Sequence, residues 1–573
     1  MTTKRFSLTV LFVCAAVFAG LIFSACGNKQ PAASSGGTSS GPVTLVIGMK
    51  TSQFITDFEN NYLTKYLENQ FNYSLDFYML PSDGNETRTK IALLVASNEL
   101  PDIVIPNGDL TGEAILDYGT QNAFLPLEKY YNDPSIASNF AKLPAEDKTL
   151  ILNSMTSADG HMYSLPRFEP EVWNFTPHRY YINKAWLDKL GLKAPSTTAE
   201  LKDVLIAFRD RDPNGNGRKD EIGAAGFFDG GYGENITAAF INSFIFYNRN
   251  QLSLDSSGRT VTAPFTDPAF RRALVYMNDL YKEGLFSAST FTTNQQEFRA
   301  LLNTQPSVVG LATLGSHTGT WPTAVKDGFS SIDYNPNFAE MDIIPPLKGP
   351  DGIAYTPYQD YVPTAAAQIS AKTKFPEQAF KLMESFLDPE IGLIARYGEE
   401  NVDWSRKPED IAKSNPNPWV VMGVFPAITR VGLPDRNTWS APNAQIWRNQ
   451  NPRYANIEMG ATGGTIPVPG APPYNPDSLA NRLHPYNYLN YASNHPQYVL
   501  PALQYTVEEA AKIAETVTNI NDYVQQSTAE FATGVRDINN DGQWNAYLRE
   551  LDNIGLKQWV STAQTVYDRQ RSR

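Results

Sequence analysis

The chain has 573 residues, of which 42% are hydrophobic and 19% charged, and its formal net charge is −13 at pH 7. This length and composition predict a large globular body of two or more domains. The acidic balance argues against nucleic-acid binding, which requires a basic surface.

The first residues have the pattern of an export signal. Lys4-Arg5 precedes an apolar stretch that ends at Ser24-Ala25-Cys26. A basic start, an apolar middle and a small-residue exit are typical of a secretory signal, which we place at residues 1–25. The exit resembles a bacterial lipobox, so we predict attachment of a diacylglycerol, and of palmitate, at Cys26. Phe23 departs from the usual leucine, and about 20 apolar residues would also suit an uncleaved membrane anchor.

Residues 26–42 are predicted to form a flexible tether. The stretch 27–41 is rich in glycine, serine and alanine and has almost no apolar side chains that could join a core. Both cysteines of the chain, Cys14 and Cys26, lie before this stretch. We therefore expect neither a disulfide nor thiol catalysis in the folded part.

From residue 43 the chain alternates between strand and helix patterns. We predict strands at 43–47, 74–79 and 101–105, and helices at 54–70 and 86–97. This order predicts a parallel sheet of α/β type. Ligands of such sheets bind beyond the carboxyl ends of the strands, so the loops after Ile47 and Ile105 are candidate ligand-binding loops.

Further helices are indicated along the remainder of the chain. Thr197-Thr198-Ala199-Glu200 is a capping box in front of an amphipathic helix. The apolar spacing predicts helices around 270–281, 380–387 and 506–523, and from 544 to the end. The stretch 401–501 is rich in proline, asparagine and aromatic residues and shows little periodicity.

The strongest local motif, DPNGNGRKDE, follows the capped helix at residues 212–221. Carboxylate and amide side chains alternate along a glycine-containing turn and can point at one centre. Calcium takes about six to eight hard oxygen ligands, so we predict a structural Ca²⁺ site; the alternative is a polar turn. The expected ligands are the side chains of Asp212, Asn214, Asn216, Asp220 and Glu221 and the backbone carbonyl of Arg218.

A second segment, residues 537–542, begins in a similar way. It reads DINNDG, but Leu548 stands where an EF-hand needs its bidentate glutamate. Whether this segment binds an ion stays open at the level of the sequence.

Several segments in the same order resemble extracellular solute-binding proteins of ABC importers, in particular large lipoproteins of the LipO type and alginate-oligosaccharide binders. The matching segments are KIALLVASNELPDIVI at 90–105, DGHMYSLPR at 159–167, YINKAWLDKLGL at 181–192, ALVYMNDLYKEGLF at 273–286 and WNAYL at 544–548. The resemblance covers essentially the whole exported chain, and residues 212–221 lie at the expected distance from these segments.

The resemblance implies a periplasmic-binding-protein-like α/β fold, in which two lobes are joined by a hinge and the ligand lies in the cleft between them. It places the first lobe at 43–165 and 346–400, and the second lobe at 166–345 and, mostly, 401–573. The chain would cross between lobes near 165–168, 343–358 and Glu399. Closure would be a hinge motion about the ligand.

Candidate ligand-binding residues lie in loops at the strand ends and at the crossings. Aromatic side chains offer a flat apolar face to sugar rings, although ordinary packing is the alternative for each of them. Arg167 would bind a carboxylate or sugar hydroxyls, or else form a salt bridge between lobes. The candidates are Thr51, Gln53, Asn107, Arg167, Trp173, Tyr232, Trp321, Tyr358 and Trp439.

We expect a membrane-tethered, extracellular or periplasmic solute-binding protein that delivers a solute, most simply an oligosaccharide, to ABC permease subunits. The acidic net charge favours a neutral ligand over a polyanion, although local charge can differ. A monomer without a catalytic role is expected. The alternatives are a peptide binder, a sensor or adhesin of the same fold, and a secreted glycosidase with paired carboxylates. The sequence has no H-E-x-x-H motif, and its G-x-S-x-G pattern at 37–41 lies in the predicted tether, so neither motif supports an enzyme.

Overall fold

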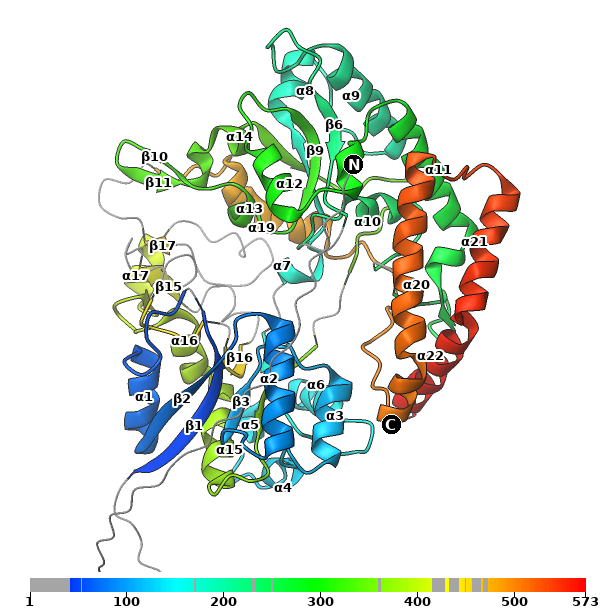
Figure 1. Ribbon diagram of the computed structural model, residues 1–573. Helices are drawn as coiled ribbons and strands as arrows, with labels where there is room; N and C mark the ends of the chain where they lie inside the picture. The colour runs from blue at the N-terminus through cyan, green and yellow to red at the C-terminus, as the bar shows by residue number, and fades with distance from the viewer. Residues whose placement is uncertain are drawn as a thin grey trace, which may run out of the picture. The chain divides into compact units, whose positions relative to one another are not determined.

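The computed structural model of the protein contains two main β-sheets, one of six strands and one of four (Figure 1). Residues from Val43 onward form one compact unit. The predicted signal peptide and tether, Cys26, Gln53 and Trp439 lie outside the described residues. The structure describes residues 42–572 except 53, 170–171, 229–231, 249–250, 359–361, 415–427, 432–442, 449, 456–464 and 467–472.

The six-stranded sheet organises the first lobe, with the strand order β16-β4-β13-β3-β1-β2. Only β13 runs against its neighbours; the other five strands share one direction. Its strands are β1 (Val43–Lys50), β2 (Tyr73–Leu80), β3 (Ile103–Ile105), β4 (Leu165–Phe168), β13 (Thr364–Ile369) and β16 (Arg453–Tyr454).

Helices flank the first sheet, and their apolar sides form its core. Leu45, Ile47 and Ile103 of the sheet are fully buried against Leu63 and Phe380 of the helices. The helices of this lobe are α1 (Tyr62–Phe71), α2 (Gly84–Ser97), α3 (Gly112–Thr120), α4 (Glu128–Tyr131), α5 (Ser138–Lys142), α6 (Ala145–Met155), α15 (Pro376–Glu384), η4 (Ser385–Leu387), α16 (Pro389–Tyr397) and α17 (Pro408–Lys413).

The predicted order of strands and helices over 43–105 is present, but α1 starts later than expected. Asn61 caps the helix, because its side chain accepts a hydrogen bond from the backbone N–H of Leu63. Before that cap, Ile55 forms a β-bridge with Asn443 from a distant part of the chain. A long-range contact therefore replaces the first predicted turns of the helix.

The four-stranded sheet organises the second lobe, with the strand order β12-β5-β9-β6. Its strands are β5 (Arg179–Asn183), β6 (Ile222–Ala225), β9 (Val309–Leu314) and β12 (Met341–Ile344). Two hairpins accompany it, β7 (Ser253–Leu254) with β8 (Val261–Thr262) and β10 (Ala324–Lys326) with β11 (Phe329–Ser331).

Helices of the second lobe include the predicted capped helix, which is α9. The capping box is formed, since Thr197 and Glu200 each bond the other's backbone N–H. The helical segments are α7 (Val172–Phe175), α8 (Lys184–Leu190), α9 (Thr198–Asp210), α10 (Ile236–Ile241), η1 (Pro264–Thr266), α11 (Pro268–Lys282), η2 (Ala288–Phe291), α12 (Gln295–Leu302), α13 (His317–Thr320), η3 (Ile332–Tyr334), α14 (Pro336–Ala339), α19 (Leu479–Asn490), α20 (Val507–Thr533), α21 (Asp541–Ile554) and α22 (Leu556–Arg571).

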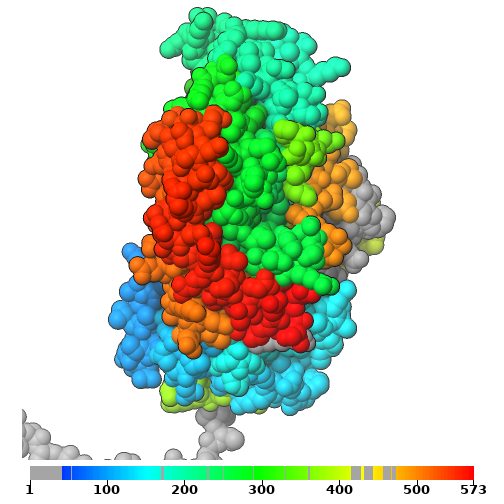
Figure 2. Space-filling view, turned by 90° about the vertical axis from the view of Figure 1, so that its right-hand side faces the viewer, coloured from blue at the N-terminus to red at the C-terminus, as the bar shows by residue number. Residues whose placement is uncertain are grey.

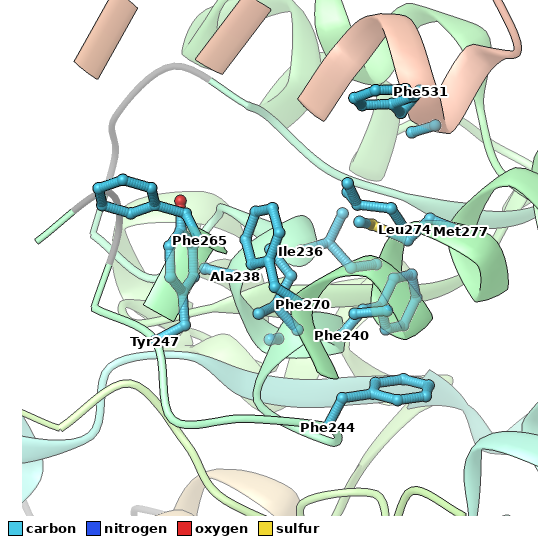
Figure 3. Close-up of a cluster of buried hydrophobic side chains, with 14 of the residues drawn as sticks. Ile236, Ala238, Phe240, Phe244, Tyr247, Phe265, Phe270, Leu274, Met277 and Phe531 are labelled. Carbon is cyan, nitrogen blue, oxygen red and sulfur yellow. The ribbon is translucent and has the colours of Figure 1, made fainter. Parts of the chain in front are cut away.

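An aromatic-rich core lies within the second lobe (Figure 3). Phe240 of α10 and Phe270 of α11 are fully buried there, and Phe531 of α20 reaches the same cluster. Figure 2 shows the C-terminal helices, coloured orange to red, covering green segments of this lobe. The end of the chain therefore stabilises the second lobe by burying apolar surface.

The described residues of 401–455 pack with the first lobe, so the stretch 401–573, which was expected to lie mostly in the second lobe, begins in the first. Trp404 and Trp447 are fully buried in the core of the first lobe, and β16 completes its sheet. A small sheet consists of β14 (Trp404–Ser405), β15 (Thr429–Val431) and β17 (Thr465–Ile466). Its first strand contains Trp404, which belongs to the core of the first lobe. The crossing predicted near Glu399 therefore lies later, between β16 and α19, because the two tryptophans bind this segment to the first core.

Within the described ranges, none of the helices combines the length and the apolar character needed to cross a bilayer.

Candidate functional site

Polar side chains gather at one edge of the six-stranded sheet. The shared direction of five strands brings their carboxyl ends to that edge. Thr51 follows β1, Asn107 follows β3, Arg167 is the second-last residue of β4 and Arg453 lies in β16. The topology therefore brings together three residues that the sequence singles out, Thr51, Asn107 and Arg167.

The second sheet presents a corresponding edge. β5 runs against β9 and β12, and β6 runs parallel to β9, so the start of β5 lies beside the ends of the other three strands. Trp173 precedes β5, Tyr232 follows β6 and His317 follows β9. The backbone N–H of Gly315 donates to the carbonyl of Tyr232 over 2.7 Å, which fixes these loops to each other.

Three chain segments join the two edges. The segment after Phe168 leaves the first edge and enters β5 at the second. The segment after Ile344 leaves the second edge and enters β13 at the first, and the segment after Tyr454 leads to α19. Since the described parts of these three segments leave one edge and enter the other, the two edges face each other as the walls of a cleft.

The first edge carries a buried carboxylate surrounded by arginines. Glu169 is 4% exposed and forms ion pairs with Arg453, with Arg396 over 2.5 Å and with Arg167 over 3.7 Å. Burial acts to raise the pKa of Glu169, but the three guanidinium groups lower it to about 2. This cluster fixes the first crossing segment to β4, β16 and α16.

Arg167 thus forms a salt bridge, which was one of its two predicted roles. Its partner, Glu169, lies two residues further along the chain and not across the cleft. The Arg167 side chain remains 27% exposed, and its distance to Glu169 is the longest of the three arginines. It can therefore still present guanidinium N–H groups to the cleft.

The second edge is built around a buried arginine. Arg179 donates to the carbonyl of Trp173, to the carbonyl of Gly315 over 2.6 Å and to Oδ1 of Asn487 over 2.8 Å. Its guanidinium carbon lies 3.2 Å from the centre of the Trp173 ring, a close cation–π contact. No sequence pattern indicated Arg179, which determines the position of the predicted residue Trp173.

Trp173 also packs against two histidines. Its ring centre lies 4.4 Å from that of His484 and 5.9 Å from that of His317. Burial lowers the pKa of His317 to about 4, and it lowers the pKa of His484 to about 3, with Arg179 contributing in both cases. Both imidazoles are therefore neutral at pH 7.

Two predicted tyrosines differ in their surroundings. The partly buried Tyr232 donates its hydroxyl hydrogen to Oδ1 of Asn174 over 2.5 Å, at the second edge. Tyr358 is 9% exposed, and its ring stacks on His495 with 3.8 Å between centres. Tyr232 thus remains accessible at the cleft wall, whereas one face of Tyr358 is covered by protein.

Trp321 does not lie at a cleft surface. Its side chain is 1% exposed and packs in a core cluster with Tyr181 and Phe338. Its indole N–H donates to the carbonyl of Leu302 over 3.2 Å. The prediction of a ligand platform at Trp321 is corrected by this burial, because the ring is enclosed by the second lobe.

Residues 212–221 fold into a turn in which the acidic side chains point inward. Asp212 accepts hydrogen bonds from the backbone N–H groups of Gly215 and Gly217 over 2.9 and 3.0 Å. The Asn214 and Asn216 amides donate to Asp220. Gly215 and Gly217 have φ of +75° and +73°, which lets the chain wrap this tightly.

Glu221 indicates that this turn fits a cation. One oxygen of its carboxylate, Oε1, is buried and has no hydrogen-bond partner in the described chain. Burial raises the pKa of Glu221, and the nearby Asp212 and Asp220 raise it further. A calcium ion would relieve this repulsion, although no three Asp, Glu, His or Cys side chains among the described residues converge into a metal site. The asparagine amides would have to turn their oxygens inward.

The second loop, residues 537–542, serves as a helix start. Asn540 caps α21 through the backbone N–H of Gln543, and Asp541 forms an ion pair with Arg271 over 2.8 Å. In this loop, Asn540 therefore stabilises the start of α21, and Asp541 binds Arg271.

An apolar cavity of about 790 Å³ lies between α3 and α20, and Tyr358 and Val362 of the segment that enters β13 also line it. Aliphatic side chains such as Leu500, Ile513 and Val517 line much of it. Because sugars need convergent hydrogen-bonding groups, this cavity suits them less well than the two sheet edges do.

The comparisons with known proteins agree with this architecture. No family model matches the chain. The chain is 25% identical over 99% of its length, and 99% of the relative's, to the fructooligosaccharide ABC transporter substrate-binding protein FusA of Streptococcus pneumoniae. It is also 25% identical to lipoprotein LipO of Bacillus subtilis, over 52% of this chain and 55% of LipO.

Solved structures show the same fold. The structure of FusA in complex with kestose superposes with a TM-score of 0.69 at 22% identity and covers 92% of this chain and 99% of that one. A second FusA structure is described as an EF-hand mutant, with a TM-score of 0.68, 22% identity and the same coverage of both chains. An HMO-binding solute-binding protein of Bifidobacterium longum infantis has a TM-score of 0.70 at 18% identity and the same coverage.

These findings confirm the predicted resemblance to solute-binding proteins of ABC transporters and the two-lobed α/β fold. The relatives are described as binding proteins, in agreement with the expectation that the chain is not an enzyme.

Proposed function

We propose that the protein is the solute-binding component of an ABC importer and that it captures an oligosaccharide between the two sheet edges. The full-length similarity to FusA is the observation that carries this proposal. The edges supply what a sugar requires, namely hydrogen-bonding groups beside aromatic side chains.

The ligand would contact residues from both edges. On the first edge we propose Thr51, Asn107 and Arg167, which lie at or just after strand ends. On the second edge we propose Trp173, in the segment before β5, and Tyr232, in the loop after β6. Tyr358 would act at the margin of the cleft. Gln53 and Trp439 remain predictions outside the described residues.

A thermal-shift screen tests this function. The purified protein would be heated with fructooligosaccharides, uronic-acid oligosaccharides, other glycans and oligopeptides. A ligand at about 100 times its Kd stabilises the folded state by roughly 2.7 kcal/mol, so one oligosaccharide class is expected to raise the Tm. A shift with peptides alone would favour the peptide-binding alternative. Recovery of shortened glycan would favour a glycosidase.

The calcium site is a separate part of the proposal. The loop at 212–221, its buried Glu221 oxygen and the EF-hand named for the FusA mutant support a structural Ca²⁺ held by the predicted ligands. The ion would join the end of α9 to the start of β6.

We further propose that Cys26 carries the lipid anchor and that ABC permease subunits receive the ligand from a monomeric protein. The lipobox-like Ser24-Ala25-Cys26 and the similarity to LipO support the anchor. Mass spectrometry of the cell-expressed protein would test it, since Cys26→Ser would abolish the added mass of the acyl chains.

A further inference from the structure

A polar contact joins the two lobes outside the three crossing segments. The side-chain amide of Gln504, in the stretch between α19 and α20, donates to the carbonyl of Asn153 over 2.8 Å and to that of Ser154 over 3.3 Å. Both carbonyls belong to the end of α6 in the first lobe. The neighbours of Gln504, Leu503 and Tyr505, pack against the core of the second lobe. These hydrogen bonds therefore run from one lobe to the other.

On the side of the first lobe, the contact satisfies groups that α6 itself leaves open. The last four carbonyls of an α-helix have no partner within the helix, and they lie at the negative end of its dipole. Those of Asn153 and Ser154 are two of the four, since α6 ends at Met155. Ile151 and Met155 are buried in the first core and fix α6 to it. Gln504 thus caps the end of α6 from the other lobe.

On the side of the second lobe, the backbone of Gln504 is held by two helices. Its N–H donates to Oε1 of Gln570 over 2.9 Å, and its carbonyl accepts a hydrogen bond from Arg569 over 2.9 Å. Arg569 also forms an ion pair with Glu509 at the start of α20 over 2.6 Å. The amide of Gln504 therefore moves with α20 and α22.

The contact borders a gap in the packing between the lobes. Leu503 and Tyr505 line the cavity of about 790 Å³, and Glu113 and Ala114 of α3 belong to its first-lobe wall. Walls that are separated by a cavity gain no packing contacts from each other. The hydrogen bonds of Gln504 therefore hold this border together where side-chain packing does not.

Such a contact distinguishes one arrangement of the lobes from others. Lobes that are joined by hinge segments rotate about those segments, and a contact away from the segments changes its length during the rotation. N–H···O bonds form over about 2.7–3.2 Å, so a displacement of about 1–2 Å breaks them.

We propose that Gln504 is a latch between the lobes, which stabilises the lobe arrangement of this structure because its amide caps α6. When the latch is broken, the lobes rotate more freely about the crossing segments. Gln504 then acts on ligand affinity without contacting the ligand, since the affinity scales with the fraction of molecules in the binding-competent arrangement. The latch depends on the two-lobed fold and not on the identity of the ligand.

Distance measurements between two spin labels, by double electron–electron resonance, test the latch. The labels are attached to cysteines that replace Ala96 of α2 and Ala546 of α21, one exposed position in each lobe. The full chain is used, with Cys14 and Cys26 replaced by serine so that only the introduced thiols react. No ligand is added.

Gln504→Glu keeps the size of the side chain but replaces the amide donor by a carboxylate, which the carbonyls at the end of α6 repel. We expect the population of other lobe distances, relative to the main distance, to rise at least about 5-fold over that of the unchanged protein. Gln504→Lys keeps a donor and adds a positive charge, which is favourable at the end of a helix, so it should retain the main distance.

Gln558→Glu is the matched control. The amide of Gln558 donates to the carbonyl of Lys512 over 3.4 Å, and both residues belong to helices of the second lobe. The same substitution there is expected to leave the distance distribution unchanged. Circular dichroism verifies the folding of every variant; if Gln504→Glu is unfolded, Gln504→Ala replaces it with the same expectation.

Two results would overturn the latch. One is an unchanged distance distribution in folded Gln504→Glu. The other is a redistribution in Gln504→Lys as large as that in Gln504→Glu, because the donor would then not be its cause. Since no ligand is added, either result leaves the proposed function intact, and absence of sugar binding in the thermal-shift screen would leave the latch intact.

Discussion

Glu169 stabilises the first crossing segment through residues that are far apart in the sequence. Arg396 and Arg453 reach its carboxylate from 227 and 284 residues away. Removing one member of a buried ion pair leaves the others uncompensated, which is far more costly than breaking a surface pair.

Glu169→Gln is therefore expected to lower the free energy of unfolding by about 3–5 kcal/mol, measured by urea denaturation. Glu283→Gln is the control, since Glu283 is exposed and lies 3.5 Å from Arg209; its effect is expected to stay below about 1 kcal/mol. Equal effects of the two substitutions would contradict the structural role of Glu169.

Trp321 provides a test that separates a core residue from a ligand platform. Trp321→Phe removes the hydrogen bond from the indole N–H to Leu302 and leaves that carbonyl unpaired in the core. We expect a loss of about 1–3 kcal/mol in stability and an unchanged affinity for the oligosaccharide. Weaker ligand binding without a loss of stability would return Trp321 to the binding site.

At the scale of elements, local patterns predicted much of the fold. The strands and helices over 43–105 follow from hydrophobic periodicity, and α9 follows from its capping box, because both signals lie within a few neighbouring residues. α19 was missed because it contains Pro485 and has weak amphipathic character. The assignment of 401–455 to the first lobe depends on Trp404 and Trp447, whose partners are distant in the sequence.

The site was predicted less completely than the fold, because its residues come together from segments that are distant in the sequence. Thr51, Asn107 and Arg167 could be named because they follow strands of a predicted sheet. The arginines that surround Glu169 come from segments with no shared motif. Only the folded topology brings their charges together.

The calcium loop between α9 and β6 gives a prediction at this scale. Removal of Ca²⁺ by EDTA is expected to lower the free energy of unfolding by about 2–3 kcal/mol, relative to Ca²⁺ at 100 times its Kd. Asp220→Asn should abolish this difference, while Asp537→Asn in the second loop should retain it. A protein whose unfolding is the same with and without EDTA would contradict the calcium assignment.

For the whole molecule, the buried histidines of the cleft wall link stability to pH. The folded pKa values of His317 and His484 are about 4 and 3, below the ordinary value of 6.5. Below pH 6.5 the unfolded chain therefore binds protons that the folded protein does not. The contribution of His317 and His484 to stability is complete above pH 6.5 and decreases as the pH falls toward 4.

We expect the free energy of unfolding to fall between pH 7.5 and pH 5, with roughly 4 kcal/mol of that loss due to these two histidines, since each contributes about 1.36 kcal/mol per pH unit below 6.5. The double variant His317→Gln/His484→Gln should lose less stability over this range than the unchanged protein. His161→Gln is the control, since His161 is 55% exposed. An identical pH dependence in the double variant would exclude the histidines as its cause.

The central claim concerns the whole molecule, namely that it binds an oligosaccharide between two facing sheet edges. Calorimetric titration of the best ligand from the thermal screen tests it most directly, with Arg167→Gln and Tyr232→Phe representing the two edges. We predict one ligand per protein, recovery of the glycan intact, and weaker binding by about 10-fold when both substitutions are combined. Absence of binding by any oligosaccharide, or an unchanged affinity in the combined variant, would contradict the account.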